Sequence, residues 1–264
     1  MKSLGRSLLR LAALLLLSLL ALQLYFAGRI ALMNLVAPQS TSFERSEIWR
    51  LAVEKHEIAW SQEWVDGDGL SRQIKRAVIA SEDAAFVEHS GVDWDALEKA
   101  WEKNQKAQAI AQKQADKRAE QMQKIAAKRP ATAKELPPPK PAKIVGGSTI
   151  TQQLAKNLFL SGERSLLRKG QEFLITFMLE ALLGKDRILE IYLNHVEWGE
   201  GVFGAQAAAR HYFRVDASRL SSNQAARLAV MLPAPKRFEK RPGSGYVLSR
   251  AATIEARMPA VELP

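Results

Sequence analysis

The sequence contains no cysteine among its 264 residues. A disulfide framework and a thiolate-bound metal centre are therefore excluded, and packing alone must hold the folded part together. The apolar content of 47% is enough for one substantial core. We therefore expect a single domain of roughly 150 to 200 residues with attached segments.

Strict alternation of apolar and polar residues is also missing, so the sequence does not favour a fold built on sheets. Helical spacing of apolar residues is found in four stretches, residues 72–85, 168–183, 186–194 and 221–232. The last of these has Ser221 or Ser222 as its expected N-cap and ends before Pro233. The fold class that this pattern predicts is mainly α.

Acidic residues are scarce, since 28 Asp and Glu face 38 Lys and Arg and leave a formal net charge of +10. Residues 102–143 contain eleven Lys or Arg against four Asp or Glu, a net charge of +7, so only +3 remains elsewhere. Most of the basic character therefore belongs to one stretch.

That stretch, taken as residues 104–142, is rich in Lys, Gln and Ala and ends in a proline-rich run. We interpret it as an insert whose first half is a solvated helix and whose second half, around residues 137–141, is extended and polyproline-like. A spacer role is favoured. A basic contact with anionic lipid headgroups or an anionic polymer is the alternative.

Residues 11–27 form seventeen uncharged, mostly apolar positions, which predicts a membrane-spanning helix over 11–28. Lys2, Arg6 and Arg10 precede it, so the positive-inside rule keeps residues 1–10 in the cytoplasm and exports the rest. A cleaved signal peptide would place Tyr25 or Arg29 at the −3 position, so an uncleaved anchor is favoured. The apolar stretch 30–36 is expected near the outer interface.

The segment GGSTITQQLAKN, residues 146–157, predicts a glycine turn followed by a capped helix. Thr149 and Gln152 have the spacing of a capping box. Thr149, Gln153 and Lys156 would share one helix face, and a helix N-terminus beside a lysine suits an anion such as phosphate. An amphipathic helix with a solvated polar side explains the same pattern.

Two other stretches carry acidic residues in helical context. Glu82 and Asp83 follow an apolar helix, where partial burial would raise a carboxyl pKa toward the range useful for proton transfer. Arg168 and Glu172 lie four residues apart beside Lys169. A solvated acidic pair and an exposed ion pair are the ordinary alternatives for these residues.

The segment GEGVFG, residues 199–204, satisfies the dinucleotide pattern G-x-G-x-x-G, but a helical pattern precedes it where a strand is required. Its glycines are therefore interpreted as backbone turns beside a cleft, and no nucleotide cofactor is expected. His56, His195 and His211 lack metal-site spacing and are interpreted as structural.

Five blocks, EDAAFVEHSG, GGSTITQQLAKNLFL, RKGQE, RILEIYLN and RLAVMLPAP, occur in the order seen in the peptidoglycan glycosyltransferases, glycosyltransferase family 51. The chain resembles the monofunctional members of this family over residues 45–250. The resemblance implies a mainly α, lysozyme-like glycosyltransferase domain with an N-terminal transmembrane helix. Residues 29–44 would form a juxtamembrane linker and residues 251–264 a C-terminal tail.

The resemblance also implies an activity: inverting polymerisation of lipid II into β-1,4 glycan, with release of undecaprenyl diphosphate, at the outer face of the bacterial inner membrane. Lipid II, the growing glycan chain, membrane lipid and other cell-wall synthesis proteins would be the partners, without nucleic acid. No S-x-x-K or K-T-G motif is present, so transpeptidase activity is not expected.

Residue roles follow from the same resemblance. Glu82 corresponds to the general base, and Glu172 to a second catalytic glutamate that holds a divalent cation, Mg²⁺ or Mn²⁺, or orients the cations around it. Basic positions around the diphosphates correspond to Lys156, Arg164, Arg168 and Lys169. The remaining substrate-binding positions, which shape the cleft, correspond to Asp83, Phe86, His89, Thr149 and Gln153.

Two other functions remain open from the sequence alone. A lytic muramidase on the same fold would use one dominant glutamate but would have no use for a row of cations. A membrane-anchored scaffold would use the basic insert to bind an acidic partner, and an exported domain rarely meets DNA.

Overall fold

The computed structural model describes residues 2–128, 146–160, 162, 163 and 165–264. They divide into a body, residues 1–92 and 149–264, and an inserted unit, residues 93–148. The first helices of the body are α1 (Lys2–Leu32), α2 (Ser42–Arg50) and α3 (Arg72–Glu82). A π-helical turn, Leu51–Lys55, directly extends α2.

The later helices of the body are α5 (Ile150–Phe159), α6 (Leu166–Leu182), α7 (Lys185–His195), α8 (Ala205–Phe213), α9 (Ser222–Met231), α10 (Pro235–Phe238) and α11 (Gly245–Arg257). Short 3-10 turns occupy Gly67–Gly69, Ala217–Arg219 and Met258–Ala260. The four predicted helical stretches correspond to α3, α6, α7 and α9, with Ser221 as the N-cap of α9. The mainly α prediction is therefore confirmed.

A small sheet was not predicted. Its strands are β1 (Ser61–Gln62), β2 (Glu197–Gly199) and β3 (Val202–Phe203), with β3 in the centre, parallel to β1 and antiparallel to β2. Two-residue strands are too short to produce a periodic signal in the sequence.

The helix expected before the glycine-rich segment 199–204 is present as α7, and the segment itself contains the end of β2, the turn and β3 of a hairpin. Gly201 has a φ of +73°, and an added Cβ would lie 1.9 Å from Ala59 O. Gly204 has a φ of +80°, with Asn194 O 2.7 Å from an added Cβ. Both positions require glycine because of the backbone turn and the close approach of another segment.

The core lies mainly where α3, α9 and α11 pack together and where α5 packs against α6 and α7. Residues 251–264 were expected to be a tail, but Ala251, Ile254, Met258 and Val261 are buried in this core. The sequence prediction was wrong here, because these apolar residues recur every three to four positions, a helical spacing that the assignment of a tail did not take into account.

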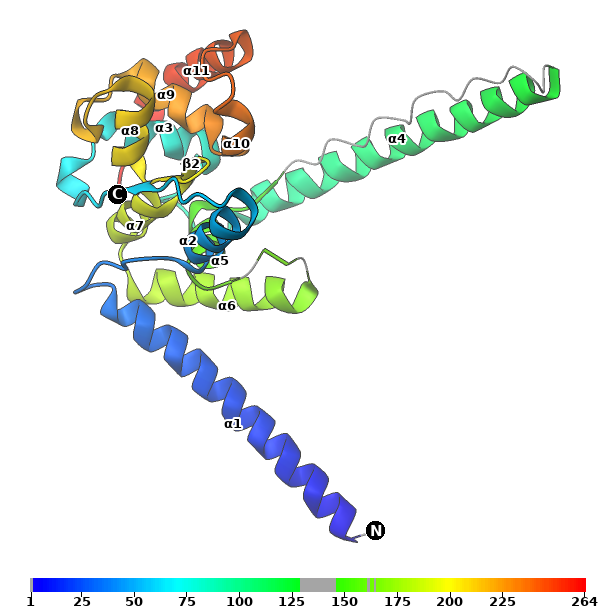
Figure 1. Cartoon of the computed structure of the whole chain (residues 1–264). Helices are drawn as coiled ribbons and strands as arrows, with labels where there is room; N and C mark the ends of the chain where they lie inside the picture. Colours follow the sequence, from blue (N-terminus) through cyan, green and yellow to red (C-terminus); the bar gives the residue numbers. More distant parts are fainter. Residues whose placement is uncertain (1, 129–145, 161, 164) are drawn as a thin grey trace. The chain divides into compact units, whose positions relative to one another are not determined.

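The N-terminal helix α1 is longer than the predicted span and approaches α6 with its C-terminal end (Figure 1). Residues 5–32 are apolar and long enough to cross a membrane, and most of their surface is exposed. The predicted linker 29–44 is instead attached to the body, because Ile30 and Met33 are buried in the core and α2 begins at Ser42.

The described part of the inserted unit, residues 93–128 and 146–148, contains one long helix, α4 (Trp94–Lys128). Asp93 Oδ1 accepts a hydrogen bond of 2.8 Å from Ala96 N at its start. The helix begins ten residues before the predicted insert, because the helical pattern continues without a break through residue 104. The first half of the predicted insert is helical and largely exposed, as predicted. The proline-rich run at 137–141 lies outside the described residues.

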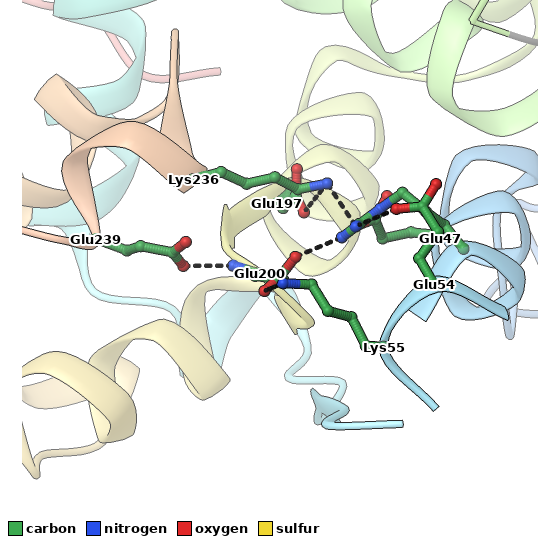
Figure 2. Close-up of polar contacts among 8 residues, drawn as sticks. Glu47, Glu54, Lys55, Glu197, Glu200, Lys236 and Glu239 are labelled. Atoms are coloured by element: carbon green, nitrogen blue, oxygen red, sulfur yellow. Dashed lines mark hydrogen bonds and ion pairs between the residues drawn. The ribbon is translucent and has the colours of Figure 1, made fainter. Parts of the chain in front are cut away.

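A network of charged residues joins α2, the hairpin and α10 (Figure 2). Lys236 contacts Glu47 by a short hydrogen bond and lies 3.5 Å from Glu197 Oε1. Arg50 contacts Glu47 and also Glu200, the latter at 2.6 Å. The network fixes the hairpin between two helices that are far apart in the sequence.

Candidate active site

Glu82 is the last residue of α3, and its side chain is partly buried. The helix is held in the core by Ile74 and Ala77, neither of which has exposed surface. Gln153 Nε2, from α5, donates to Glu82 Oε2 at 3.1 Å, and Ser81 Oγ donates to Oε1 at 3.3 Å. Neutral donors from two helices therefore orient the carboxylate.

Burial is the main influence on the Glu82 carboxyl, and it raises its pKa above the ordinary value of 4.5. The hydrogen bonds from Gln153 and Ser81 lower the pKa, while the neighbouring charge of Asp83 raises it. A carboxylate with a raised pKa is a stronger proton acceptor, which suits a general base near neutral pH.

Asp83, the next residue, is buried and has both carboxylate oxygens occupied. Its Oδ1 lies 2.8 Å from His89 Nε2, and its Oδ2 accepts a 2.9 Å hydrogen bond from the backbone N–H of Ile150. Ile150 is the first residue of α5, where free amides and the helix dipole favour a carboxylate. Asp83 therefore joins the end of α3 to the start of α5 and keeps Glu82 opposite Gln153.

The start of α5 is the predicted capping box, and this prediction is confirmed. Thr149 Oγ1 accepts from Gln152 N at 3.2 Å, while Gln152 Oε1 accepts from Thr149 N at 3.1 Å. Thr149 Oγ1 also donates to Gly91 O at 2.6 Å, which attaches the helix to the loop that follows Glu82.

Three residues predicted to bind substrate have almost no exposed surface: Asp83 at 6%, Phe86 at 0% and Thr149 at 2%. Phe86 packs beneath Lys185, whose Nζ lies 4.5 Å from the ring centroid. Burial leaves these side chains little surface for a ligand, and the contacts of Asp83 and Thr149 position Glu82 and α5. Their assignment as substrate-binding residues that shape the cleft stays a prediction. His89, also predicted, is partly exposed and is held by Asp83.

Tyr192, on α7, is a site residue to which sequence reasoning gave no role. It is fully buried, and its hydroxyl donates to Gln153 Oε1 at 2.9 Å. This contact fixes the orientation of the amide, so that Nε2 faces Glu82. A buried tyrosine needs a hydrogen-bond partner, but only the packing of α7 on α5 identifies which one.

The cationic residues gather on α5 and the first turns of α6. Glu172, buried on α6, accepts a 3.0 Å hydrogen bond from Arg168 and a short one from Lys169. Lys156 is three residues after Gln153 on α5, so the two side chains follow the same face of the helix. The helices α5 and α6 pack against each other. The site therefore runs from Glu82 through Gln153 to the cations.

Lys156 as a whole residue is exposed to solvent, but protein atoms surround its ammonium group. The resulting partial desolvation lowers the pKa of Lys156. Arg168 and Lys169 lower this pKa further, and Glu172 opposes them. These charges are therefore close enough to interact. Three cations against one carboxylate give the cluster a net charge of +2, which attracts an anion.

The sequence predicts that Glu172 either holds a divalent cation or orients the cations around it. Its contacts with Arg168 and Lys169 favour orientation of the cations. Both of its oxygens already accept hydrogen bonds from cations, and the described residues contain no group of three His, Asp or Glu arranged to hold a metal. This donor set fits a divalent cation poorly. Arg164 lies outside the described residues.

The histidines interpreted as structural have different surroundings. His195 is buried, with Nδ1 2.8 Å from Glu44 Oε1 and Nε2 3.0 Å from Pro38 O. His56 is exposed with a φ of +55°, at the end of the π-helical turn, and His211 stacks edge-on with its neighbour Tyr212. His195 is a bridge between the body and the segment that follows α1.

Comparison with known proteins gives consistent matches. A protein-family model described as Transglycosylase matches residues 52–114 and 131–259. The biosynthetic peptidoglycan transglycosylase of Paraburkholderia phytofirmans is 48% identical over 93% of this chain and 88% of that protein. The proteins of the same name from Paraburkholderia xenovorans and Burkholderia pseudomallei are 47% and 49% identical over the same share of this chain, covering 88% and 83% of their own lengths.

The fold and these matches define a lysozyme-like glycosyltransferase domain, as the sequence predicted. The chain belongs to the biosynthetic peptidoglycan transglycosylase family, and it is an enzyme of peptidoglycan synthesis. The break in the family match, residues 115–130, falls inside the insert predicted from composition.

Proposed function

We propose that this chain polymerises lipid II into β-1,4-linked glycan by an inverting displacement and releases undecaprenyl diphosphate. One observation carries the proposal: a partly buried carboxylate with a raised pKa, Glu82 on α3, accepts a hydrogen bond from Gln153, which shares a face of α5 with Lys156 of the cationic cluster on α5 and α6. A base and a diphosphate site are the two components that such a displacement needs.

In the proposed reaction, Glu82 accepts the proton of the acceptor sugar's 4-hydroxyl as that oxygen forms a bond to the anomeric carbon of the donor. The bond from this carbon to the diphosphate breaks at the same time, and the diphosphate leaves with the electron pair. Lys156, Arg168 and Lys169 stabilise the negative charge that develops on it. A diphosphate needs no proton to leave, so one carboxylate suffices.

A membrane location is part of the proposal. The helix α1 exposes leucines along most of its length, and α6, which packs against α1, exposes Leu166, Leu167, Leu174 and Phe177. Exposed apolar surface of this extent needs cover, and a bilayer supplies it. Lys2, Arg6 and Arg10 then keep the N-terminus in the cytoplasm and place the body in the periplasm, where lipid II is polymerised.

Incubation of the purified full-length chain with lipid II tests the proposal. We expect wild-type protein to form glycan strands and Glu82→Gln to lose activity by about 10²- to 10⁴-fold, the usual contribution of a general base. Glu88→Gln is the matched control, because Glu88 is an exposed acid on the loop that follows Glu82.

Absence of glycan with the wild-type chain, or equal activity of wild type and Glu82→Gln, would contradict the proposal. Degradation of purified sacculi in the absence of synthesis would indicate the muramidase alternative. Association with other cell-wall synthesis proteins and a role for Mg²⁺ or Mn²⁺ stay predictions, which co-purification and chelation would test.

A further inference from the structure

A pocket of about 460 Å³ lies between the end of α1 and the start of α2, and no residue of the proposed active site lines it. Two arginines, Arg29 and Arg45, contribute its charge, and Leu32, Met33 and Val36 contribute apolar surface. The lining therefore combines a cationic part and an apolar part, as a site for an amphiphile requires.

The segment that forms the wall of this pocket is fixed to the body. Arg187 Nε donates to Met33 O at 2.8 Å, and His195 Nε2 lies 3.0 Å from Pro38 O. These contacts come from α7, which belongs to the core. The pocket is therefore preformed and does not depend on a ligand to order its wall.

Both arginines of the pocket have neutral partners. Arg29 donates to the Tyr25 hydroxyl at 3.1 Å, and Arg45 donates to Ser40 O at 3.2 Å and to Ser42 Oγ at 3.0 Å. Neither forms an ion pair with any residue that the structure describes, and the lining contains no Asp or Glu. Two positive charges therefore remain available to an anion.

A second arginine-lined pocket of about 380 Å³ has an acid in its lining. There Arg210 is paired with Asp216, which also lines the pocket, at 3.1 Å, and with Glu63 at 2.5 Å. Asp216 and Glu63 compensate Arg210, whereas Arg214 and Arg219 of the same lining form no ion pair with the described residues. The pocket beside α1 differs from this one in having no acid in its lining and in combining its arginines with Leu32, Met33 and Val36.

The position of Arg29 along α1 sets the level of the pocket relative to a bilayer. It is the first charged residue after the uncharged stretch and lies nineteen positions after Arg10. At 1.5 Å per residue this is about 28 Å, close to the thickness of the hydrocarbon core. Arg29 and the exposed Tyr25 beside it therefore lie at the level of the lipid phosphates.

We propose that this pocket binds the headgroup of one anionic phospholipid of the outer leaflet. Its phosphate contacts Arg29 and Arg45, and the glycerol and first acyl carbons lie against Leu32, Met33 and Val36. The proposal rests on the membrane anchoring by α1 proposed above, but not on the polymerisation reaction. Bidentate guanidinium contacts suit phosphate, and a net charge of +2 favours an anionic over a zwitterionic lipid.

The test is a lipid titration of the full-length chain in a non-ionic detergent, with bound lipids counted by native mass spectrometry. Phosphatidylglycerol and phosphatidylcholine with identical acyl chains are compared. We expect one phosphatidylglycerol to bind in preference to phosphatidylcholine, and Arg29→Gln or Arg45→Gln to reduce that preference about fivefold each. Arg45→Lys should retain most of it, because the charge remains.

Arg250→Gln, which removes an exposed arginine from α11, is the matched control and should leave the preference unchanged. Thermal unfolding of each variant checks that the segment after α1 remains folded. Equal binding of the two lipids to wild type, or an unchanged preference in the double variant Arg29→Gln/Arg45→Gln, would overturn the proposal.

Undecaprenyl phosphate forms a third arm of the titration, because it offers the same phosphate chemistry. Its displacement of phosphatidylglycerol at equal concentration would overturn the phospholipid assignment and give the site to the isoprenoid. Lipid II is absent from the experiment, so failure of the proposed polymerisation cannot produce any of these outcomes. Failure of anchoring would be separately visible as a chain that carries no detergent.

Discussion

At the scale of single residues, Gln153 links the proposed base on α3 to α5 and α7. Its amide donates to Glu82 and accepts from Tyr192, so one side chain both orients the carboxylate and lowers the pKa that burial has raised. The hydrogen bond favours the ionised form because it is made to the charged oxygen. Gln153 therefore tunes the base as well as positioning it.

Replacement of Gln153 by leucine tests this role. Loss of the hydrogen bond should raise the Glu82 pKa further, so the acidic limb of the pH profile of kcat/KM should move to higher pH. Initial rates of lipid II polymerisation between pH 5 and pH 9 measure the limb. Gln73→Leu on α3 is the control, and an unmoved limb in Gln153→Leu would show that the amide does not influence the base.

Glu197 is a second residue with an unusual charge state. It shares Lys236 with Glu47, which forms the closer contact and also binds Arg50 (Figure 2). Burial raises the pKa of Glu197 to about 7. Burial also acts to raise the pKa of Glu47, but hydrogen bonds from Arg50 and Lys236 outweigh it, so the pKa of Glu47 is lowered. One shared lysine therefore stabilises one of the two buried carboxylates more than the other.

The pH dependence of stability follows from the raised pKa of Glu197. Between pH 4.5 and about 7 the folded state retains a proton that the unfolded state has lost, so stability falls as pH rises through this window. Glu197→Gln should raise the free energy of unfolding at pH 8 by about 1 to 3 kcal/mol relative to wild type, and by much less at pH 5.

Urea unfolding of wild type and Glu197→Gln at both pH values measures the difference. Glu57→Gln, which changes an exposed glutamate, should behave as wild type at both. A stabilisation that is equal at pH 5 and pH 8 would show that titration of Glu197 is not its source.

At the scale of elements, the site depends on how the loop after α3 meets the start of α5. Two side chains make this junction, Asp83 to the amide of Ile150 and Thr149 to the carbonyl of Gly91. Gly91 has a φ of +87°, which glycine adopts without strain. Gly91 therefore allows the loop to turn so that its carbonyl reaches Thr149 at the start of α5.

Gly91→Ala should destabilise the body by about 1 to 3 kcal/mol, because of the positive φ and the lack of space. An added Cβ would lie 2.7 Å from Thr176 Cγ2 and 2.9 Å from Glu180 Cγ, both on α6. Thermal unfolding measures the loss. Gly162→Ala is the control, since an added Cβ there meets no atom within 4 Å. Equal stability of the two variants would contradict the constraint.

At the scale of the whole molecule, the body contains every described residue of the proposed site, and the inserted unit, residues 93–148, contributes none. The long helix α4 is mostly exposed and carries eight Lys or Arg against five Asp or Glu, a net charge of +3. These features agree with the interpretation of residues 104–142 as a spacer or a basic contact, and leave the choice between them to experiment.

Replacement of residues 104–142 by a short Gly/Ser linker should leave the thermal stability of the body and polymerisation of lipid II by solubilised protein nearly unchanged. Surface loops tolerate changes in length because the closure entropy varies slowly with it. If the same variant binds anionic vesicles more weakly than wild type, the insert is a basic contact with lipid headgroups. Loss of polymerisation in detergent would show that the insert is part of the catalytic unit.

The sequence by itself determined the elements and the chemistry-bearing blocks. Helical spacing and caps are local properties, so α3, α6, α7 and α9, the capping box at Thr149 and the apolar N-terminal helix were all predictable. Motif order indicated Glu82, Lys156 and Arg168 as members of one site.

Only the tertiary structure decided what each of those residues touches. Four features depend on contacts between segments far apart in the chain. They are the hydrogen bond of Asp83 to α5, the burial of Phe86, the contact of Tyr192 with Gln153 and the packing of residues 251–264. The two-residue strands and the pocket beside α1 likewise arise where separate segments meet. Such contacts leave no periodic trace in a sequence, because the partner of a side chain is set by packing and not by its neighbours along the chain.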